Sequence, residues 1–284
     1  SEEVVGGREN GGEMTGITSC WPGWIQYCEK KHPELLPNSA TCRAPMQMFA
    51  SLIKDQSAKA SKKMFHVAVM PCTGKKFEAA RDEFKEDGVP NVDAVLTTQE
   101  LIRMIKESGI VFSELEPEAI DMPFGTISGA GLIFGVTGGV TEAVLRRVVS
   151  NKSRSALMTV ANSGQRGMDG VKEFDLTYGD KNLHIAVVSG LNNAESVIKR
   201  MKNGEKFDFI EVMACPGGCI CGGGQPFAMA EERAERGRGL YDADRLLSIR
   251  RAEENPIIDS LYSDIIKGKV HKLLHVDYVK GDEK

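Results

Sequence analysis

Residues 209–226 read FIEVMACPGGCICGGGQP and place three of the chain's seven cysteines within seven residues. The cysteines follow an apolar run and lie inside a glycine-rich turn. Cysteine thiolates are the usual ligands of iron–sulfur clusters. Neighbouring glycines let the backbone fold tightly round an inorganic core and direct amide N–H groups at its sulfides. The stretch therefore predicts a buried metal-cluster site.

The apolar run is one of several that alternate with helical patterns along the chain. Four runs predict strands that lead into helices or into the cysteine turn: residues 65–70, 93–96, 184–188 and 207–213. This order predicts an α/β fold of two lobes, each a twisted, mainly parallel sheet flanked by helices. Ligands of such sheets bind at the carboxyl ends of the strands, where Cys72 and Cys215 fall, so we expect the cluster between the lobes. Residues 242–252 and 256–266 predict helices of a C-terminal segment that wraps the outside.

Composition excludes several classes of protein. The 284 residues are 41% hydrophobic, which is enough for a large core, and the net charge of -4 comes from well-mixed charges. We therefore expect neither a nucleic-acid surface nor a polybasic membrane patch. No run approaches the roughly 20 apolar residues of a membrane span, and residues 1–19 lack the pattern of a secretory leader. An odd number of clustered cysteines favours metal binding in a reducing compartment, so we expect a cytoplasmic protein.

Three cysteine-bearing segments stand in a characteristic order: TSCWPGW at 18–24, MPCTGKKFE at 70–78 and EVMACPGGC at 211–219. Each resembles one signature of the catalytic domain of FeFe-hydrogenases. Residues 128–140 and 166–173 also resemble segments of this family, so the resemblance covers nearly the whole chain. It implies a catalytic domain similar to the large subunit over residues 1–235 and a helical segment similar to the small subunit over 236–284.

The resemblance implies an H-cluster, in which a 4Fe–4S cubane is bridged to a diiron subcluster carrying carbon monoxide, cyanide and a dithiolate bridge. Cys72, Cys215 and Cys219 correspond to cubane ligands, and Cys219 corresponds to the bridge between the two parts.

Further residues match the surroundings of the diiron unit. Met70 and Met213 match thioethers that line its pocket, and Lys75 matches an ammonium that donates to a cyanide ligand. A buried lysine needs such an anion to keep its charge. Glu78 would be a supporting partner one layer farther from the cluster. The resemblance thus assigns catalytic or supporting roles to all four side chains.

The first signature departs from the family, which usually has two adjacent cysteines, a proton relay followed by a cubane ligand. Trp21 occupies the second position, and an indole cannot ligate iron. Either Cys20 becomes the ligand and the thiol relay is lost, which we favour, or Cys20 stays a relay and the cubane takes Cys28, Cys42 or a non-thiol donor. From the residues alone, Cys28 and Cys42 are best interpreted as small buried hydrophobes, and Cys221 as a thiol that closes the turn.

The function implied by the resemblance is the reversible interconversion of protons plus electrons and dihydrogen. Ferredoxin or another electron-transfer protein would supply electrons, hydrogenase maturation proteins would supply the diiron unit, and the chain could be one subunit of a larger complex.

Two alternative functions stay open. Trp21 and Ala40, which stands where the family often has a proton-pathway serine, suggest a sensory or catalytically impaired relative. An iron–sulfur assembly or scaffold protein would bind only cubanes. His271 and His275 lie four residues apart and could bind zinc, although a solvent-facing pair is the favoured interpretation.

Overall fold

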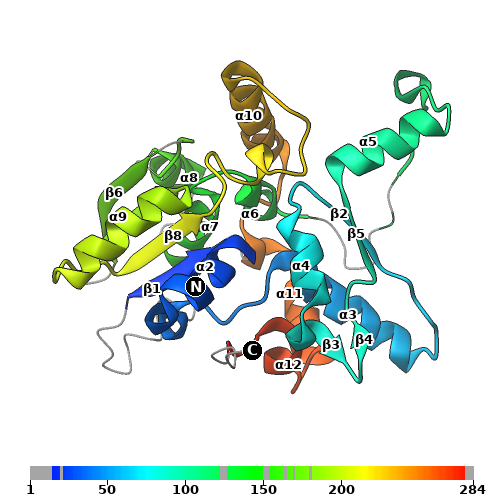
Figure 1. The fold of residues 1–284 in the computed structure, drawn as a ribbon, viewed down its shortest axis with the longest axis horizontal. Helices are drawn as coiled ribbons and strands as arrows, with labels where there is room; N and C mark the ends of the chain where they lie inside the picture. The colour runs from blue at the N-terminus through cyan, green and yellow to red at the C-terminus, as the bar shows by residue number, and fades with distance from the viewer. Residues whose placement is uncertain are drawn as a thin grey trace.

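The structure is a computed structural model that describes residues 15–19, 22–119, 121, 127–149, 154–162, 165–168, 170–178 and 181–278. It is an α/β structure in which sheets containing parallel strands are flanked by helices, as the sequence predicted. The larger sheet lies at the left of Figure 1 and a smaller one at the right, with helices between and around them.

In the described part of the chain, the larger sheet has four strands in the order β1 (Gly16–Ser19), β8 (Phe209–Met213), β7 (Lys181–Ser189), β6 (Val171–Tyr178). The first three run parallel, with Ile17 opposite Ile210 and Val188 opposite Val212. Strand β6 pairs antiparallel with β7. Every residue of β8 is buried, as expected for a parallel strand that has helices on both faces.

The helices on the two faces are α2 (Pro22–Lys31) with α9 (Leu191–Lys202), and α7 (Gly139–Val148) with α8 (Arg154–Ala161). Ala186 and Val188 of β7 belong to the core that contains Trp24 of α2 and Val197 of α9. Ile185 belongs to the core formed with α7 and α8. Alternate residues of one strand therefore fill the two layers of the core.

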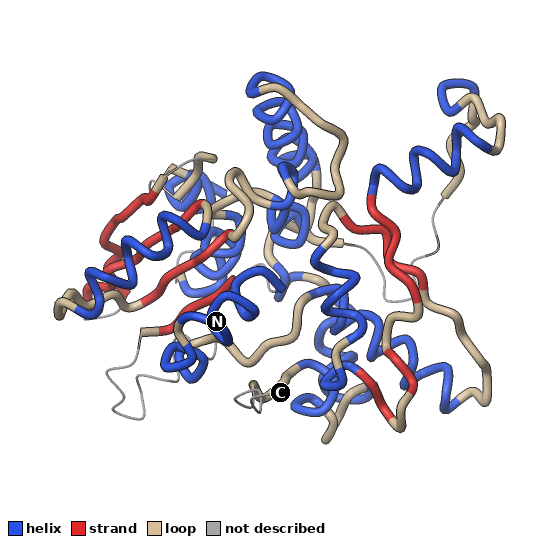
Figure 2. The backbone as a smooth tube through the Cα atoms, viewed as in Figure 1, coloured by secondary structure: helices blue, strands red, loops and turns tan. Residues whose placement is uncertain are grey.

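The smaller sheet pairs β2 (Val67–Met70) in parallel with β5 (Ala94–Thr97), and Figure 2 shows the two strands apart from the larger sheet. The helices α3 (Pro45–Lys59) and α4 (Gly74–Ala80) pack here through Met46, Ala50 and Ala79. The helix α5 (Thr98–Glu107) begins at a capping box made by Thr97 and Glu100. A short hairpin of β3 (Lys85–Glu86) and β4 (Val89–Pro90) follows α4.

The C-terminal region is helical, with α10 (Ala230–Leu246), α11 (Pro256–Ser260) and α12 (Val270–Leu274). Leu273 and Leu274 pack against Leu52 of α3.

The prediction of a helix at 242–252 was wrong: the helix in this region starts at Ala230 and ends at Leu246. Gly237 and Gly239 lie inside it and weaken the helical signal. The division expected between residues 235 and 236 falls within α10 and stays a prediction. Over the residues described, no helix has both the length and the apolar character needed to cross a membrane.

Candidate metal centre

Two of the predicted ligands follow directly from strand ends. Strand β2 ends at Met70 and is followed by Pro71 and Cys72, whereas β8 ends at Met213 and leads through Ala214 to Cys215. Both strands belong to parallel pairs, whose carboxyl ends favour ligand sites. The two sheets therefore each contribute one cysteine loop.

The third signature packs on the second through backbone contacts. The amide N–H of Gly224 donates to the carbonyl oxygen of Pro71 at 3.0 Å, and the N–H of Gln99 donates to Gly224 O at 3.0 Å. A Cβ atom on Gly224 would lie 2.9 Å from the backbone nitrogen of Cys72, and one on Gly222 would lie 2.3 Å from Pro71 O. Glycine is required at both positions because the two main chains touch. These contacts bring the second and third cysteine segments together.

The start of α2 joins the same centre. Cys20, the favoured fourth ligand, and Trp21 lie outside the described residues, but Pro22 and Gly23 follow them directly. A Cβ atom on Gly74 would lie 3.1 Å from Pro22 Cγ and 3.4 Å from Cys72 Sγ. One on Gly23 would lie 2.7 Å from Ala214 Cβ. The first segment therefore contacts the other two.

The turn that contains Cys219 is fixed by glycines with left-handed backbone. Gly217 has φ +85° and Gly218 has φ +89°. A Cβ atom on Gly218 would lie 2.8 Å from the backbone nitrogen of Thr137 and 2.9 Å from Gly135 O. Gly217 N–H donates to Ser189 Oγ at 2.9 Å. The glycines of the signature thus allow close contact with residues 135–137 and with the end of β7.

The buried carboxylate of Glu211 holds the neighbouring helix. It accepts hydrogen bonds from Gly138 N–H at 2.7 Å, from Thr141 N–H at 2.6 Å and from Thr141 Oγ1 at 2.6 Å. Burial raises the pKa of Glu211, while these donors act in the opposite direction. An acidic residue within an apolar strand was a visible signal in the sequence, but its partners at the start of α7 were missed.

The predicted cation Lys75 is paired inside the protein. Its Nζ donates to Glu78 Oε2 at 2.6 Å, and both side chains are buried. Burial raises the pKa of Glu78, and Lys75 opposes this effect. The other oxygen of the carboxylate, Glu78 Oε1, is buried without a hydrogen-bond partner among the residues described. The pair was anticipated correctly as a contact; its catalytic role stays a prediction.

Gln47, at the start of α3, is a further polar residue that the sequence did not single out. Its side chain is 0% exposed, and both amide atoms lack a hydrogen-bond partner in the described part of the molecule. Its neighbour Met46 packs in the same apolar cluster as Ala79, which follows Glu78, and Met70, which ends β2. Leaving a buried donor or acceptor unpaired typically costs about 1–3 kcal/mol. Such atoms fit a site that receives a polar, non-protein group.

The remaining candidate thiols lie in different surroundings. Cys28 is enclosed in the apolar core of the larger sheet, and burial, with Glu34 and Glu29 adding to it, raises the pKa of its thiol to about 12. A protonated thiol is a poor metal ligand at neutral pH. Cys42 forms an isolated β-bridge with His275 near the C-terminal helices. Cys221 packs beside Ile220 and Leu240, and a Cβ atom on Gly217 would lie 2.8 Å from its Sγ.

Comparison with known families accounts for this arrangement. Residues 1–223 match the family model described as the C-terminal domain of the iron-only hydrogenase large subunit. The chain belongs to the iron-only hydrogenase family. Residues 230–281 also match the model of the iron hydrogenase small subunit.

The relatives of this hydrogenase-family chain include two kinds of protein. It is 42% identical over 274 residues to NADP-reducing hydrogenase subunit HndD of Solidesulfovibrio fructosivorans, covering 93% of this chain and 47% of that protein. It is 39% identical to iron hydrogenase 1 of Clostridium pasteurianum, covering 98% of this chain and 51% of that protein. Cytosolic iron-sulfur assembly component 3 of Mus musculus is 34% identical, and the match covers 92% of this chain and 58% of that protein. The chain therefore spans about half the length of these relatives.

Solved structures agree with the fold. A variant of the FeFe-hydrogenase HydA1 from Chlamydomonas reinhardtii superposes with a TM-score of 0.76 at 34% identity, covering 99% of this chain and 78% of that one. The chain is therefore a hydrogenase-like iron–sulfur protein. Its cysteine segments, which backbone contacts bring together, and the glycine turns beside them fit an iron–sulfur cluster.

Proposed function

We propose that this chain binds a cubane bridged to a diiron unit and interconverts protons plus electrons with dihydrogen. The observation that carries the proposal is the set of buried polar atoms on α3 and α4, the two helices that pack on the smaller sheet. Lys75 places an ammonium inside the protein, while Glu78 Oε1 and the amide of Gln47 lack protein partners among the described residues. A cubane alone requires thiolates and backbone N–H groups, and would leave these polar side chains unused. The cyanide ligands of a diiron unit accept hydrogen bonds and would give a partner to the donors among these groups, the ammonium of Lys75 and the amide N–H of Gln47.

The residues of the chain would act as ligands, donors and barriers to water. Cys72, Cys215 and Cys219 would hold the cubane, and Cys219 would bridge to the diiron unit. When bound, the group supplies an open iron site of Lewis-acid character and a store for single electrons. Lys75 has Glu78 as its buried partner and would donate a further hydrogen bond into the pocket.

The protein also controls access to the pocket. Met213, 1% exposed, would present an apolar thioether that limits water, and Met70 would do so from the end of β2. Cys20 would complete the cubane. Electrons would arrive from ferredoxin or another electron-transfer protein, and maturation proteins would insert the diiron unit.

A second candidate is an iron–sulfur assembly component that binds cubanes alone. The 34% identity to the murine assembly component over 92% of this chain favours it. Trp21 also favours it, because it removes one thiol from the first signature. This candidate requires the cysteines and glycine turns, and it leaves Lys75 and Gln47 without a direct role.

The deciding experiment is anaerobic reconstitution with iron and sulfide, followed by loading with a synthetic diiron complex. Hydrogen evolution from reduced viologen, total iron and the infrared bands of carbon monoxide and cyanide are measured on one sample. We expect about six irons per chain, four from the cubane and two from the diiron unit, together with both kinds of band and hydrogen. About four irons without bands or gas would reject the proposal and support the assembly candidate.

Two cysteine variants sharpen the result. Cys219→Ala should lose the diiron bands, because it removes the bridging thiolate. Cys28→Ala is the matched control, since its thiol lies in the apolar core, and it should keep them. Retention of the bands in Cys219→Ala would contradict the assignment of the bridge.

A further inference from the structure

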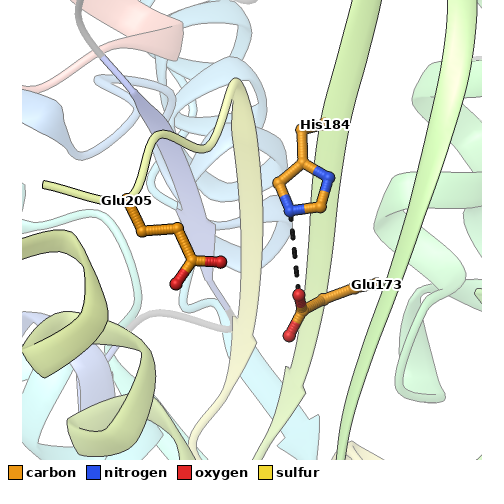
Figure 3. Close-up of side chains that lie close together, drawn as sticks. All are labelled: Glu173, His184 and Glu205. Atoms are coloured by element: carbon orange, nitrogen blue, oxygen red, sulfur yellow. Dashed lines mark ion pairs between the residues drawn. The ribbon is translucent and has the colours of Figure 1, made fainter.

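Three ionisable side chains meet at the end of the larger sheet that lies away from the cysteine turn. Glu173 comes from β6, His184 from β7 and Glu205 from the loop after α9 (Figure 3). His184 Nε2 lies 3.7 Å from Glu173 Oε2, and one ligand atom from each residue lies within 4.8 Å of the other two. At bonds of about 2.1 Å, two ligand atoms of a tetrahedral ion lie about 3.4 Å apart. The spacing therefore requires only small side-chain movements to enclose an ion.

The imidazole is oriented by a carboxylate on its other side. His184 Nδ1 lies 2.8 Å from Asp175 Oδ1, and the register of the hairpin places these two residues directly opposite each other. An Nδ1–H donated to Asp175 leaves the lone pair of Nε2 directed toward Glu173. The ring also stacks on the buried Phe207, with centroids 5.0 Å apart and planes at 25°. A carboxylate that fixes the tautomer of a histidine is the usual support of a metal-binding imidazole.

We propose that Glu173, His184 and Glu205 bind a divalent transition-metal ion such as Zn²⁺, with water completing the coordination. One imidazole with two carboxylates suits Zn²⁺ and similar first-row transition-metal ions. Mg²⁺ and Ca²⁺ prefer oxygen ligands alone.

Arg200 of α9 is the competitor for this site. Its Nη1 and Nη2 donate to Glu173 at 2.5 and 2.8 Å, and its Nε donates to Glu205 at 2.6 Å. The guanidinium thus neutralises the same oxygens that the ion would use. Its side chain is 35% exposed, so it can turn into solvent when an ion takes its place. The ion must therefore displace Arg200 from both carboxylates, and the free energy of these ion pairs lowers the metal affinity.

The ion would connect an edge strand to the rest of the sheet. Strand β6 pairs only with β7 among the described strands, and Glu205 precedes β8. The site lies five residues before Ser189, which contacts the cysteine turn through Gly217. This separation corresponds to about 17 Å along a strand. Zinc binding is therefore independent of which cluster the cysteines hold.

The test uses protein already loaded with its iron–sulfur cluster, because the cluster cysteines would otherwise take zinc. Zn²⁺ is titrated against a chromophoric chelator, and zinc X-ray absorption identifies the ligands. We expect one zinc per chain with a nitrogen and oxygen shell that includes one imidazole. A sulfur shell, or no zinc bound in competition with the chelator, overturns the proposal whatever the variants do.

The variants separate this site from other histidines. His184→Asn should abolish binding, and Asp175→Asn should weaken it about 10- to 100-fold through loss of the orienting carboxylate. Arg200→Met should strengthen it, because the competitor is gone. His271→Asn, which removes one of two histidines whose rings lie 5.3 Å apart near the C-terminus, should leave it unchanged. Binding that survives His184→Asn, is lost in His271→Asn or is not strengthened in Arg200→Met contradicts the site.

Discussion

Replacing Lys75 by methionine should destabilise the protein strongly, in a way that depends on pH. The substitution keeps the length and apolar stem of the side chain but removes the ammonium that pairs with Glu78 Oε2 at 2.6 Å. The carboxylate of Glu78 is 0% exposed, so water cannot replace the lost partner. The variant must either keep a buried anion without its ion pair or bind a proton there.

The size of the effect follows from the burial of both groups. Breaking a buried ion pair by removing one partner costs about 3–5 kcal/mol. In the variant, burial raises the folded-state pKa of Glu78 above its unfolded value of about 4.3, and Lys75 no longer opposes this shift. The penalty is therefore small below that unfolded value, grows as the pH rises, and is complete above the folded-state pKa. Replacing both residues by methionine should restore most of the stability, since no charge is then buried alone.

Urea unfolding of the anaerobic apoprotein at pH 8 and pH 5 measures these differences. Lys76→Met is the matched control, because Lys76 pairs with Glu100 at the surface at 2.9 Å and exposed pairs contribute under about 1 kcal/mol. At pH 8 we expect the free energy of unfolding to decrease in the order wild type, Lys76→Met, double variant, Lys75→Met. At pH 5 the difference between wild type and Lys75→Met should be smaller. A Lys75→Met loss below about 1 kcal/mol, or the same loss at both pH values, would refute the buried pair.

Two further substitutions test the contacts that build the cysteine turn. Glu211→Gln leaves one oxygen for three donors and should lower the free energy of unfolding by about 2 kcal/mol. The exposed Glu231→Gln should change it by under about 0.5 kcal/mol in the same urea experiment, and equal effects would contradict the argument. Gly224→Ala would place Cβ 2.9 Å from Cys72 N and should reduce the iron bound on reconstitution. Gly239→Ala is the control, because no atom lies within 4 Å of the new Cβ. It should bind the wild-type amount of iron and gain up to about 1 kcal/mol in stability. A wild-type amount of iron in Gly224→Ala would show that the turn tolerates displacement.

Local sequence was sufficient for the strands β2, β5, β7 and β8 and for the position of the cysteines at strand ends, but β1 and β6 of the larger sheet were missed. The apolar run before Cys215 became β8, and that before Cys72 became β2. The capping box of Thr97 and Glu100 is equally local, because its two hydrogen bonds lie within one helical turn. The resemblance to hydrogenases rested on motifs that are contiguous in the chain, and the family comparisons confirmed it.

Sequence was insufficient where a residue's partner lies far along the chain. The helix that begins at Ala230 was placed too late, because its Gly237 has low helical propensity yet approaches Ile220 closely, and tertiary packing outweighs propensity. Glu211 was visible as an acidic residue in an apolar strand, but its donors at Gly138 and Thr141 are more than 65 residues away. Gln47 lies in residues 41–48, which also resemble the family, but the burial of its amide could not be read from its neighbours.

The sequence by itself determined which thiols, thioethers and charges this chain offers and on which kind of element each lies. Periodicity and turn chemistry are properties of a few neighbouring residues, so they can be read directly. Only the tertiary structure decided that Gly224 lies against Pro71, that Pro22 lies beside Cys72, and that Lys75 is closed off from water with Glu78. Burial and contact between distant segments depend on the packing of the whole chain, and no local pattern encodes them.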